Sequence, residues 1–278
     1  MIKVEEVNFT YPSGIEALHN VTLEIQDREF VAVMGENGAG KSTLIRHFNG
    51  LLKPSKGEVY IDGVNTRKAS VAELSRNVGL VFQNPDHQLF CETVEEEVAF
   101  GMRNFGFKED LIADRVEKTL EFLDLTRYKK SSPFMLSGGE RKRVALAAVL
   151  AWDPKIMVID EPTIGQDYAQ KEKLRQFVIK LNAQGRTVIM VTHDVEFVAD
   201  CAPRVVVMSG GRVVDDGSAR EILTDSEGLL EASIIPPQIT QVLSAMSDLG
   251  LKKDVIDILE AEKIIENLVR WGKASEGL

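Results

Sequence analysis

Hydrophobic and polar side chains follow two different periods along the chain. Residues 2–10 and 21–26 alternate between the two types, which predicts strands with one buried face. Short, continuous apolar runs elsewhere predict strands that are buried on both faces. These runs cover residues 30–34, 155–159, 187–191 and 204–208.

Segments with helical spacing of apolar side chains lie between these strands. Apolar side chains recur at helical spacing after the first continuous run, and Pro54 is expected to end this helix because proline disfavours helical backbone at the residue before it. Residues 169–182 also have a helical pattern. Strands that alternate with helices predict an α/β fold with a mostly parallel sheet. The apolar positions of the first helix are Leu44, Ile45, Phe48, Leu51 and Leu52.

A longer helical stretch interrupts this alternation. From residue 93 to 150 the apolar spacing is helical throughout, which predicts a helical insert, at about 85–150, within the α/β domain. Further on, Pro236-Pro237 opens the first of two amphipathic helices. We therefore expect an α/β domain at residues 1–220 and a small helical C-terminal appendage at 221–278, which packs or dimerises through its apolar stripes.

Charge and composition limit the partners. The net charge of −10 argues against nucleic-acid binding, which needs a basic face, and the compact run Arg141-Lys142-Arg143 is expected to be a solvated helix face. The longest apolar run, Val144–Trp152, is far below the roughly 20 residues that span a bilayer, and the first residues carry no secretion signal. Cys91 and Cys201 do not suggest a disulfide framework or a zinc site, which is compatible with a reducing cytosol. Any membrane role is therefore expected to be peripheral, through a partner.

A phosphate-binding loop is the strongest chemical signal. Residues 35–42 fit the pattern G-x-x-x-x-G-K-[ST], between a buried strand and a helix as the pattern requires. Lys41 is expected to reach the β- and γ-phosphates of a nucleotide, and Ser42 to bind Mg²⁺. The pattern alone predicts a nucleoside triphosphate and leaves kinases, GTPases, helicases and transport ATPases open. The expected nucleotide-binding residues are Gly35, Glu36, Asn37, Gly38, Ala39, Gly40, Lys41, Ser42 and Thr43.

Two acids end the buried strand at 155–159. Because a buried strand rejects charge, acids at its end indicate a cation or a catalytic role. Asp160 is expected to hold Mg²⁺, and Glu161 to orient or deprotonate an attacking water. The alternative is a pair of helix-capping acids before Pro162.

A second anion site is predicted at Leu136-Ser137-Gly138-Gly139-Glu140, directly before a helical run. The Ser137 hydroxyl and the N–H groups that follow can hold a γ-phosphate at the helix N-terminus. The spacing of Ser137 and Glu140 also fits a capping box, and one turn can do both. These five residues resemble the signature of ATP-binding-cassette (ABC) ATPases. The resemblance implies a head-to-tail dimer with the same subunit or a paralogue, in which the phosphate loop of one subunit and the signature of its mate hold each ATP.

Other positions resemble this family in the expected order. Tyr11 resembles the aromatic residue that stacks on adenine, with an ordinary turn tyrosine as the alternative. Gln83 resembles the glutamine that contacts Mg²⁺ and links the helical insert to the core. Residues 163–167 resemble the loop that meets its twin across the dimer, and His193 resembles the switch histidine at the γ-phosphate. Departures from the family pattern are mild and remove no catalytic group; they are Glu36, Glu140 and Gln166.

One segment narrows the resemblance. Residues 81–90, followed by Thr93-Val94 and residues 98–101, are similar to the ATPases of energy-coupling-factor transporters, including the cobalt and nickel group. This similarity implies uptake of a vitamin or a transition-metal ion, and an integral membrane partner that contacts the region near Asp86–Phe90. It also implies a place at the cytoplasmic face of the cell membrane.

Two alternatives remain at this point. A soluble ABC ATPase of DNA repair or translation usually carries tandem cassettes or long coiled coils, whereas this chain has one cassette and no sustained heptads. A small-molecule kinase with a phosphate loop would not need Ser137-Gly138-Gly139 or His193.

Overall fold

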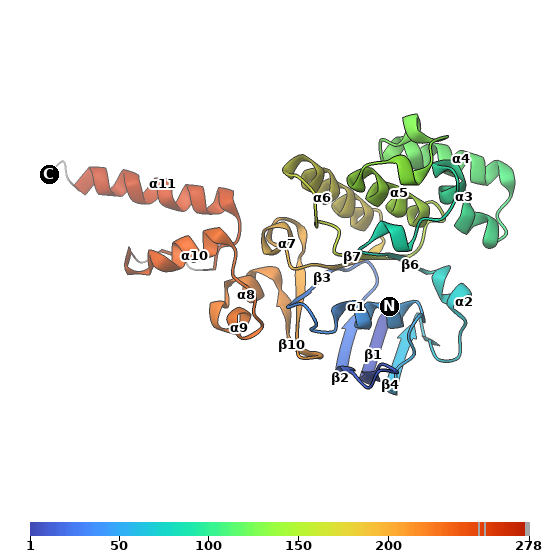
Figure 1. Ribbon diagram of the computed structural model, residues 1–278. Helices are drawn as coiled ribbons and strands as arrows, with labels where there is room; N and C mark the ends of the chain where they lie inside the picture. Colours follow the sequence, from blue (N-terminus) through green and yellow to red (C-terminus); the bar gives the residue numbers. More distant parts are fainter. Residues whose placement is uncertain (250, 253, 276–278) are drawn as a thin grey trace.

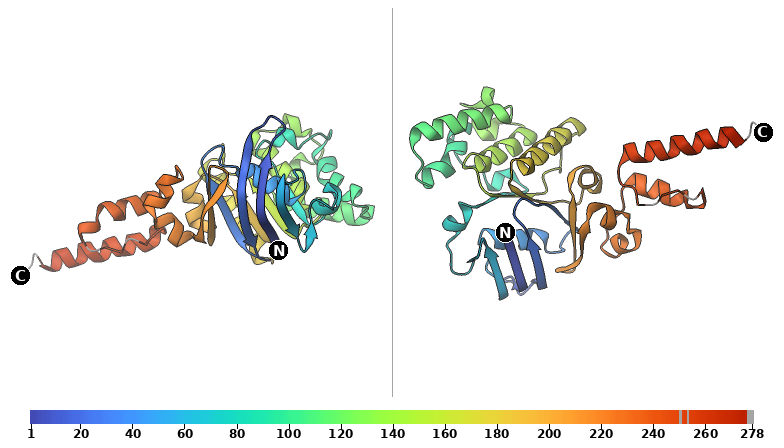
Figure 2. Two further views of the ribbon diagram at one scale, coloured as in Figure 1. Left: turned by 90° about the horizontal axis from the view of Figure 1, so that it is seen from below. Right: turned by 180° about the vertical axis from the view of Figure 1, so that it is seen from behind.

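The computed structural model describes residues 1–249, 251–252 and 254–275. Residues 250, 253 and 276–278 of the predicted appendage lie outside the described residues. Two sheets and their surrounding helices make up the α/β part, and the C-terminal helices project from one side of it (Figures 1 and 2).

The larger sheet confirms the predicted parallel core. Its strand order is β10-β9-β3-β8-β7-β6, and every neighbouring pair is parallel except β9 and β10. The four continuous apolar runs form strands at its centre. The strands are β3 (Phe30–Gly35), β6 (Val78–Val81), β7 (Ile156–Asp160), β8 (Thr187–Val191), β9 (Arg204–Ser209) and β10 (Arg212–Ser218).

The smaller sheet is antiparallel, with the order β2-β1-β4-β5. Its first strand matches the prediction, but the second begins at Glu16 and not at residue 21, because it continues to pair with β1 through bulged positions. The alternation of residues 56–61 was not recognised as a strand. The strands are β1 (Ile2–Thr10), β2 (Glu16–Ile25), β4 (Lys56–Ile61) and β5 (Val64–Asn65).

Helix α1 (Lys41–Phe48) lies between the two sheets, and its apolar side chains join both sheets in one core. The expectation that this helix continues to Pro54 is wrong. The helix ends at Phe48 because Asn49 leaves helical geometry and Gly50 has a φ of 75°, a left-handed conformation that glycine favours. The short α2 (Val71–Ser75) follows β5.

The helical insert packs on the opposite face of the larger sheet, together with α6 (Tyr168–Ala183) (Figure 1). It contains α3 (Val94–Asn104), α4 (Glu109–Phe122) and α5 (Gly138–Leu150). The expectation of helix throughout 93–150 is wrong for residues 105–108, where Gly106 has a φ of 79°, and for residues 123–137. There the left-handed backbone of Asp124 and the fixed φ of Pro133 allow only short 3-10 turns.

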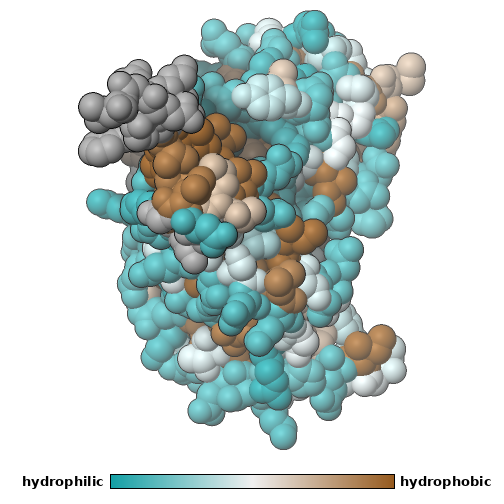
Figure 3. Space-filling model, turned by 90° about the vertical axis from the view of Figure 1, so that its left-hand side faces the viewer, coloured by the Kyte–Doolittle hydropathy of each residue, from teal (hydrophilic) through white to brown (hydrophobic). Residues whose placement is uncertain are grey.

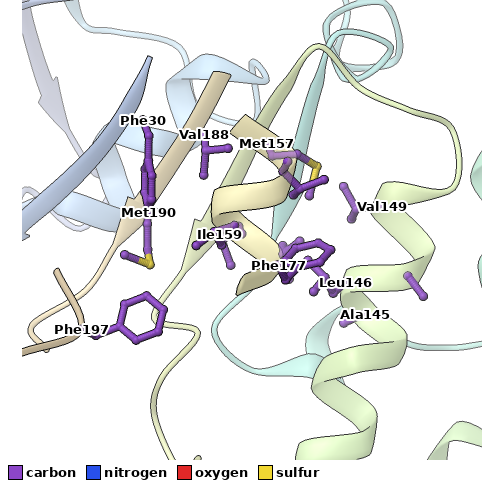
Figure 4. Close-up of a cluster of buried hydrophobic side chains, with 14 of the residues drawn as sticks. Phe30, Ala145, Leu146, Val149, Met157, Ile159, Phe177, Val188, Met190 and Phe197 are labelled. Carbon is purple, nitrogen blue, oxygen red and sulfur yellow. The ribbon is translucent and has the colours of Figure 1, made fainter. Parts of the chain in front are cut away.

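Alternate side chains of β3 enter different cores. Phe30, Ala32 and Met34 face the insert, whereas Val31 and Val33 face α1. Figure 4 shows the first of these cores, where Phe177 of α6 and Leu146 of α5 lie near the side chains of the central strands. The sheet therefore separates α1 from α5.

Helix α7 (Val195–Cys201) joins β8 to β9 within the α/β part. The chain after β10 contains α8 (Ala219–Thr224), α9 (Ser226–Glu231), α10 (Gln238–Ala245) and α11 (Ile258–Ser275). Leu243, Val255 and Ala261 form a small core of the appendage, and Arg220 of α8 pairs with Glu260 at 2.6 Å. None of the described helices is both long enough and apolar enough to cross a membrane.

Candidate nucleotide site

The phosphate loop is a tight turn between β3 and α1. A Cβ on Gly35 would lie 2.1 Å from the carbonyl oxygen of Met208, and one on Gly40 would lie 2.6 Å from that of Ala17. Both glycines also have positive φ, so larger side chains are excluded twice over. The loop therefore presents backbone N–H groups at the start of α1, as an anion site requires.

Lys41 is buried and lies across this loop. Its Nζ donates hydrogen bonds to the carbonyl oxygens of Gly35 at 2.7 Å and Glu36 at 2.8 Å. Burial lowers the pKa of Lys41, and the nearby charges of Glu161 and Asp160 oppose this effect. The ammonium group is thus held beside the loop and the acids that end β7.

Ser42 and Asp160 meet at the same edge. The Ser42 hydroxyl donates to the Asp160 carboxylate at 3.2 Å, and Asp160 is buried. Burial raises the pKa of Asp160; the Ser42 bond lowers it and the charge of Glu161 raises it further. A hydroxyl and a carboxylate are hard oxygen donors of the kind that Mg²⁺ prefers.

Glu161 and His193 form a second pair. His193 Nδ1 lies 2.9 Å from a carboxylate oxygen of Glu161, which is buried, whereas the histidine side chain is 60% exposed. Glu161 has a φ of 48°, which is uncommon for a residue other than glycine and recurs at functional sites. Its backbone N–H also bonds to Val191 at the end of β8, so the pairing of β7 and β8 brings the acid and the histidine together.

Gln83 lies at the end of β6 on the same side. It lines a cavity of about 360 Å³ with Asp160, Glu161 and Gly139, between α5 and α6. This cavity adjoins the two acids and does not include the phosphate loop itself. Gln83, the two acids and the start of α5 therefore surround one cavity.

Tyr11 is half-buried beside α1. Its hydroxyl shares a 2.9 Å hydrogen bond with the Thr43 hydroxyl, and its ring packs edge-on against Phe9. The tyrosine thus lies next to the helix that begins at the phosphate loop, which is compatible with the predicted adenine contact.

The signature residues form a complete capping box. The Ser137 hydroxyl accepts from the Glu140 N–H at 3.4 Å, and Glu140 accepts from the N–H and the hydroxyl of Ser137. Tyr128 and Ser137 donate to Glu140 and lower the pKa of its carboxyl to about 2. Ser137 and Gly138 are exposed, and a Cβ on Gly138 would meet nothing within 4 Å. Space within the chain therefore does not explain a glycine at this position.

The phosphate loop and the signature open helices that pack on opposite faces of the sheet. α1 belongs to the core shared with the antiparallel sheet, and α5 belongs to the core shared with the insert (Figure 1). The sheet thus separates the helix that follows the phosphate loop from the helix that follows the signature.

The basic run at 141–143 differs from expectation. All three side chains are half-buried, and none is simply solvated. Lys142 donates to the carbonyl oxygen of Ile164, burial lowers its pKa, and it lines the cavity with Glu161. Arg141 pairs with Asp86 at 3.4 Å. A charge run gives no signal of such distant partners, so sequence reasoning missed these residues.

Comparison with known proteins assigns the fold to a family. The family model for ABC transporters matches residues 18–164, more than half of the chain. The chain belongs to the ABC transporter family. It is an ATP-binding, ATP-hydrolysing subunit of the ABC type, as the signature predicted.

Two relatives cover most of this chain. The energy-coupling factor transporter ATP-binding protein EcfA2 of Clostridium perfringens is 40% identical over 97% of this chain and 98% of its own length. A putative ABC transporter ATP-binding protein of Caldanaerobacter subterraneus is 43% identical over 87% of this chain, but the chain spans only 42% of that protein.

Solved structures agree with the fold. CbiO1 from Clostridium perfringens, described as part of the ABC transporter complex cbiONQ, has a TM-score of 0.73 and 36% identity over 83% of this chain and 93% of its own. A dimeric structure of the bacterial ABC transporter cassette MJ0796 has a TM-score of 0.73 and 35% identity over 79% of this chain and 99% of its own. The predicted phosphate-loop fold is therefore confirmed.

Proposed function

We propose that this ABC ATPase binds ATP between two subunits and powers an energy-coupling-factor importer. The observation that carries the proposal is that the helices which follow the phosphate loop and the signature, α1 and α5, pack on opposite faces of one sheet. One nucleotide reaches both only if the signature comes from a second subunit, and the dimeric cassette structure supports this arrangement.

The residues present fit ATP and Mg²⁺. The loop at 35–40 tolerates no Cβ at Gly35 or Gly40, which leaves a cradle of backbone donors beside the Lys41 ammonium. Glu36, Asn37, Gly38 and Ala39 complete this loop. Ser42 and buried Asp160 offer oxygen ligands for the metal, with Gln83 nearby as the third candidate ligand.

Each side chain then has a distinct role. Lys41 and the loop bind the β- and γ-phosphates. Tyr11 and Thr43, which share a hydrogen bond at the first turn of α1, lie beside the nucleoside part of ATP. When bound, Mg²⁺ neutralises phosphate charge and orients the terminal phosphate. Glu161 orients or deprotonates the attacking water. His193 holds the Glu161 carboxylate at 2.9 Å and lies at the γ-phosphate side.

Closure of the dimer on ATP, and its reopening after hydrolysis, drive the transport step. Ser137, Gly138 and Gly139 bind the γ-phosphate of the mate's ATP, so the dimer is stable only while that phosphate is attached. Gln83 links the site to the insert, and movement of the insert shifts the segment Asp86–Phe90. Phe90 is 59% exposed and packs edge-on against Phe100, which supports a docking surface here.

The membrane partner is an integral transporter subunit at Asp86–Phe90, and the solute is a vitamin or a transition-metal ion such as cobalt or nickel. Similarity to EcfA2 and to CbiO1 supports this assignment. The chain would then act at the cytoplasmic face of the cell membrane as a peripheral subunit.

The appendage at 221–278 is proposed to help hold the dimer together. Figure 3, which views the molecule from the end that bears α10 and α11, shows hydrophobic side chains gathered on its surface. Exposed apolar residues in this region include Leu230, Ile235, Ile258 and Leu259. Such a surface suits a second copy of the same region.

The test uses a hydrolysis-blocked variant. Glu161→Gln is expected to bind Mg-ATP, lose turnover and form dimers in sedimentation velocity. Gly138→Asp in the same background is the control, because nothing within the chain opposes its Cβ and only the mate's phosphate would meet its charge. A Glu161→Gln protein that stays monomeric with saturating Mg-ATP, alone and with a paralogue, contradicts the proposal.

A further inference from the structure

The side-chain amide of Gln88 joins two elements of the site. Gln88 Oε1 accepts a hydrogen bond from the backbone N–H of Phe82 at 3.1 Å. Gln88 Nε2 donates to the carbonyl oxygen of Ala145 at 2.7 Å. Both bonds are short enough to be well formed, and the side chain is half-buried.

The bridge joins the residue before Gln83 to the helix that begins at the signature. Phe82 directly precedes Gln83 and follows β6, whose last pairing is Val81 with Ile159. Ala145 lies in α5, the helix that Ser137 caps. A single amide therefore connects the backbone N–H of Phe82, one residue before Gln83, to the helix that Ser137 caps, and β6 and α5 lie beside each other in the fold (Figure 1).

Only an amide of this length meets both demands. The Phe82 N–H needs an acceptor, the Ala145 carbonyl has room for a second donor, and a glutamine side chain supplies one of each. A carboxylate would keep the first bond and lose the second, and an aliphatic side chain would lose both. The Ala145 carbonyl can accept this bond in addition to its own helical bond because it has two lone pairs.

The rest of the loop is attached to the same helix. Asp86 pairs with Arg141 of α5 at 3.4 Å, and Leu89 and Pro85 are buried. The segment from Phe82 to Phe90 thus rests on α5 as a folded unit. A shift of Gln83 relative to α5 would break the Gln88 bridge.

We propose that Gln88 is a positioning residue that makes Gln83, helix α5 and the segment Asp86–Phe90 move as one body when the nucleotide site closes. This inference rests on the proposed function, because it concerns closure of the shared site. Gln88 touches neither nucleotide nor metal in this account; it acts through Gln83 and the signature helix.

The experiment compares Gln88→Leu and Gln88→Glu in the Glu161→Gln background. Gln26→Leu makes the same chemical change at an exposed turn and is the matched control. Dimerisation with Mg-ATP is measured by sedimentation velocity, and ATP affinity of the single subunit is measured with a fluorescent ATP analogue. Amide hydrogen exchange at Phe82 reports the bridge directly.

Gln88→Leu is expected to weaken ATP-dependent dimerisation roughly tenfold, the effect of losing one or two ordinary hydrogen bonds. ATP affinity of the single subunit should stay within about twofold of the parent, because the phosphate loop is intact. Exchange at Phe82 should accelerate in Gln88→Leu and much less in Gln88→Glu, which keeps the Phe82 bond.

Two outcomes would overturn the inference while leaving the proposed function intact. One is parent-like dimerisation of Gln88→Leu despite faster exchange at Phe82. The other is a Gln88→Leu variant that melts at a lower temperature and loses ATP affinity and dimerisation to the same extent. A merely structural role of Gln88 would produce that result. If the Glu161→Gln parent itself does not dimerise, the proposed function fails and this inference fails with it.

Discussion

Glu97 is expected to fix the predicted docking segment through a buried charge. The residue is 3% exposed, and its carboxylate accepts hydrogen bonds from the backbone N–H groups of Phe90 and Cys91, each at 2.8 Å. Hydrogen bonds to a charged acceptor contribute about 1.5–3 kcal/mol each, and bonds to a neutral acceptor about 0.5–1.5 kcal/mol. Both N–H groups bond to the same oxygen, Oε2, so the amide oxygen of Glu97→Gln can still accept both bonds while the charge is lost. We therefore expect the free energy of unfolding to fall by about 2 kcal/mol, the difference between two charged and two neutral bonds.

Removal of the acceptor should cost more. Glu97→Leu leaves two buried N–H groups without an acceptor, at about 1–3 kcal/mol each, and a total loss of about 4 kcal/mol is expected. Urea unfolding followed by tryptophan fluorescence measures both changes. Glu92→Gln is the matched control, because Glu92 is exposed in the same loop and should unfold as the parent does.

The Cys91 thiol gives an independent readout of the same carboxylate. Burial, and then the charge and hydrogen bond of Glu97, raise the pKa of Cys91 to about 11. Without that charge the pKa should fall, and more thiolate should be present at pH 8. In a Cys201→Ser background, alkylation of Cys91 by iodoacetamide should be several-fold faster in Glu97→Gln. Parent-like urea midpoints together with parent-like alkylation rates would refute the reasoning.

Three further outcomes are expected. Tyr11→Phe should lose about 1 kcal/mol of stability with the Thr43 bond yet keep ATP affinity, whereas Tyr11→Ala should weaken ATP binding roughly tenfold in equilibrium titrations if the ring stacks on adenine. His193→Gln should lower steady-state turnover at least about 100-fold while ATP still binds, and near-normal turnover would contradict its role. The hydrogen bond from Arg220 depresses the Glu260 pKa to about 2, so its stabilisation is present above the unfolded pKa near 4.5 and is lost as the pH falls through about 2. Proteolysis of the appendage by pepsin should therefore increase over that range in the parent, and Glu260→Gln should remove this pH dependence.

Much of the site was predictable because its chemistry is contiguous in sequence. The phosphate loop, the acid pair at the end of β7 and the signature each hold the residues of their proposed function within a few adjacent positions. The edge of a parallel sheet then brings Lys41, Ser42 and Asp160 together, as strands followed by such motifs predict. The continuous apolar runs identified the central strands for the same reason, since burial on both faces leaves a strong local pattern.

The rest of the structure depends on contacts that leave no local pattern. β4 was missed because only Val59 and Ile61 among its residues are buried and its pairing with β1 is distant in sequence. Residues 123–137 kept an apolar spacing, but Asp124 and Pro133 break the helix there. Gln88 has no motif of its own, and its role follows only from two backbone groups that lie 6 and 57 residues away along the chain.

The groups that we propose contact ATP already have partners within the chain. Lys41 bonds to loop carbonyls, Ser42 to Asp160, His193 to Glu161, and the Ser137 hydroxyl to Glu140. Lys41, Asp160 and Glu161 are buried, and a buried polar group without a partner costs about 1–3 kcal/mol, so their bonds stabilise the subunit by itself. Ser137 and His193 are exposed, and their hydrogen bonds exchange readily with water. When nucleotide binds, these hydrogen bonds within the chain are replaced by hydrogen bonds to the nucleotide, and few are added. Each replacement therefore contributes little net free energy. Under the proposed function, the drive for closure comes from pairing phosphate charge with Lys41 and with the helix N-termini of both subunits, and that contribution falls when the terminal phosphate leaves. A subunit built in this way is suited to close and reopen once for each ATP.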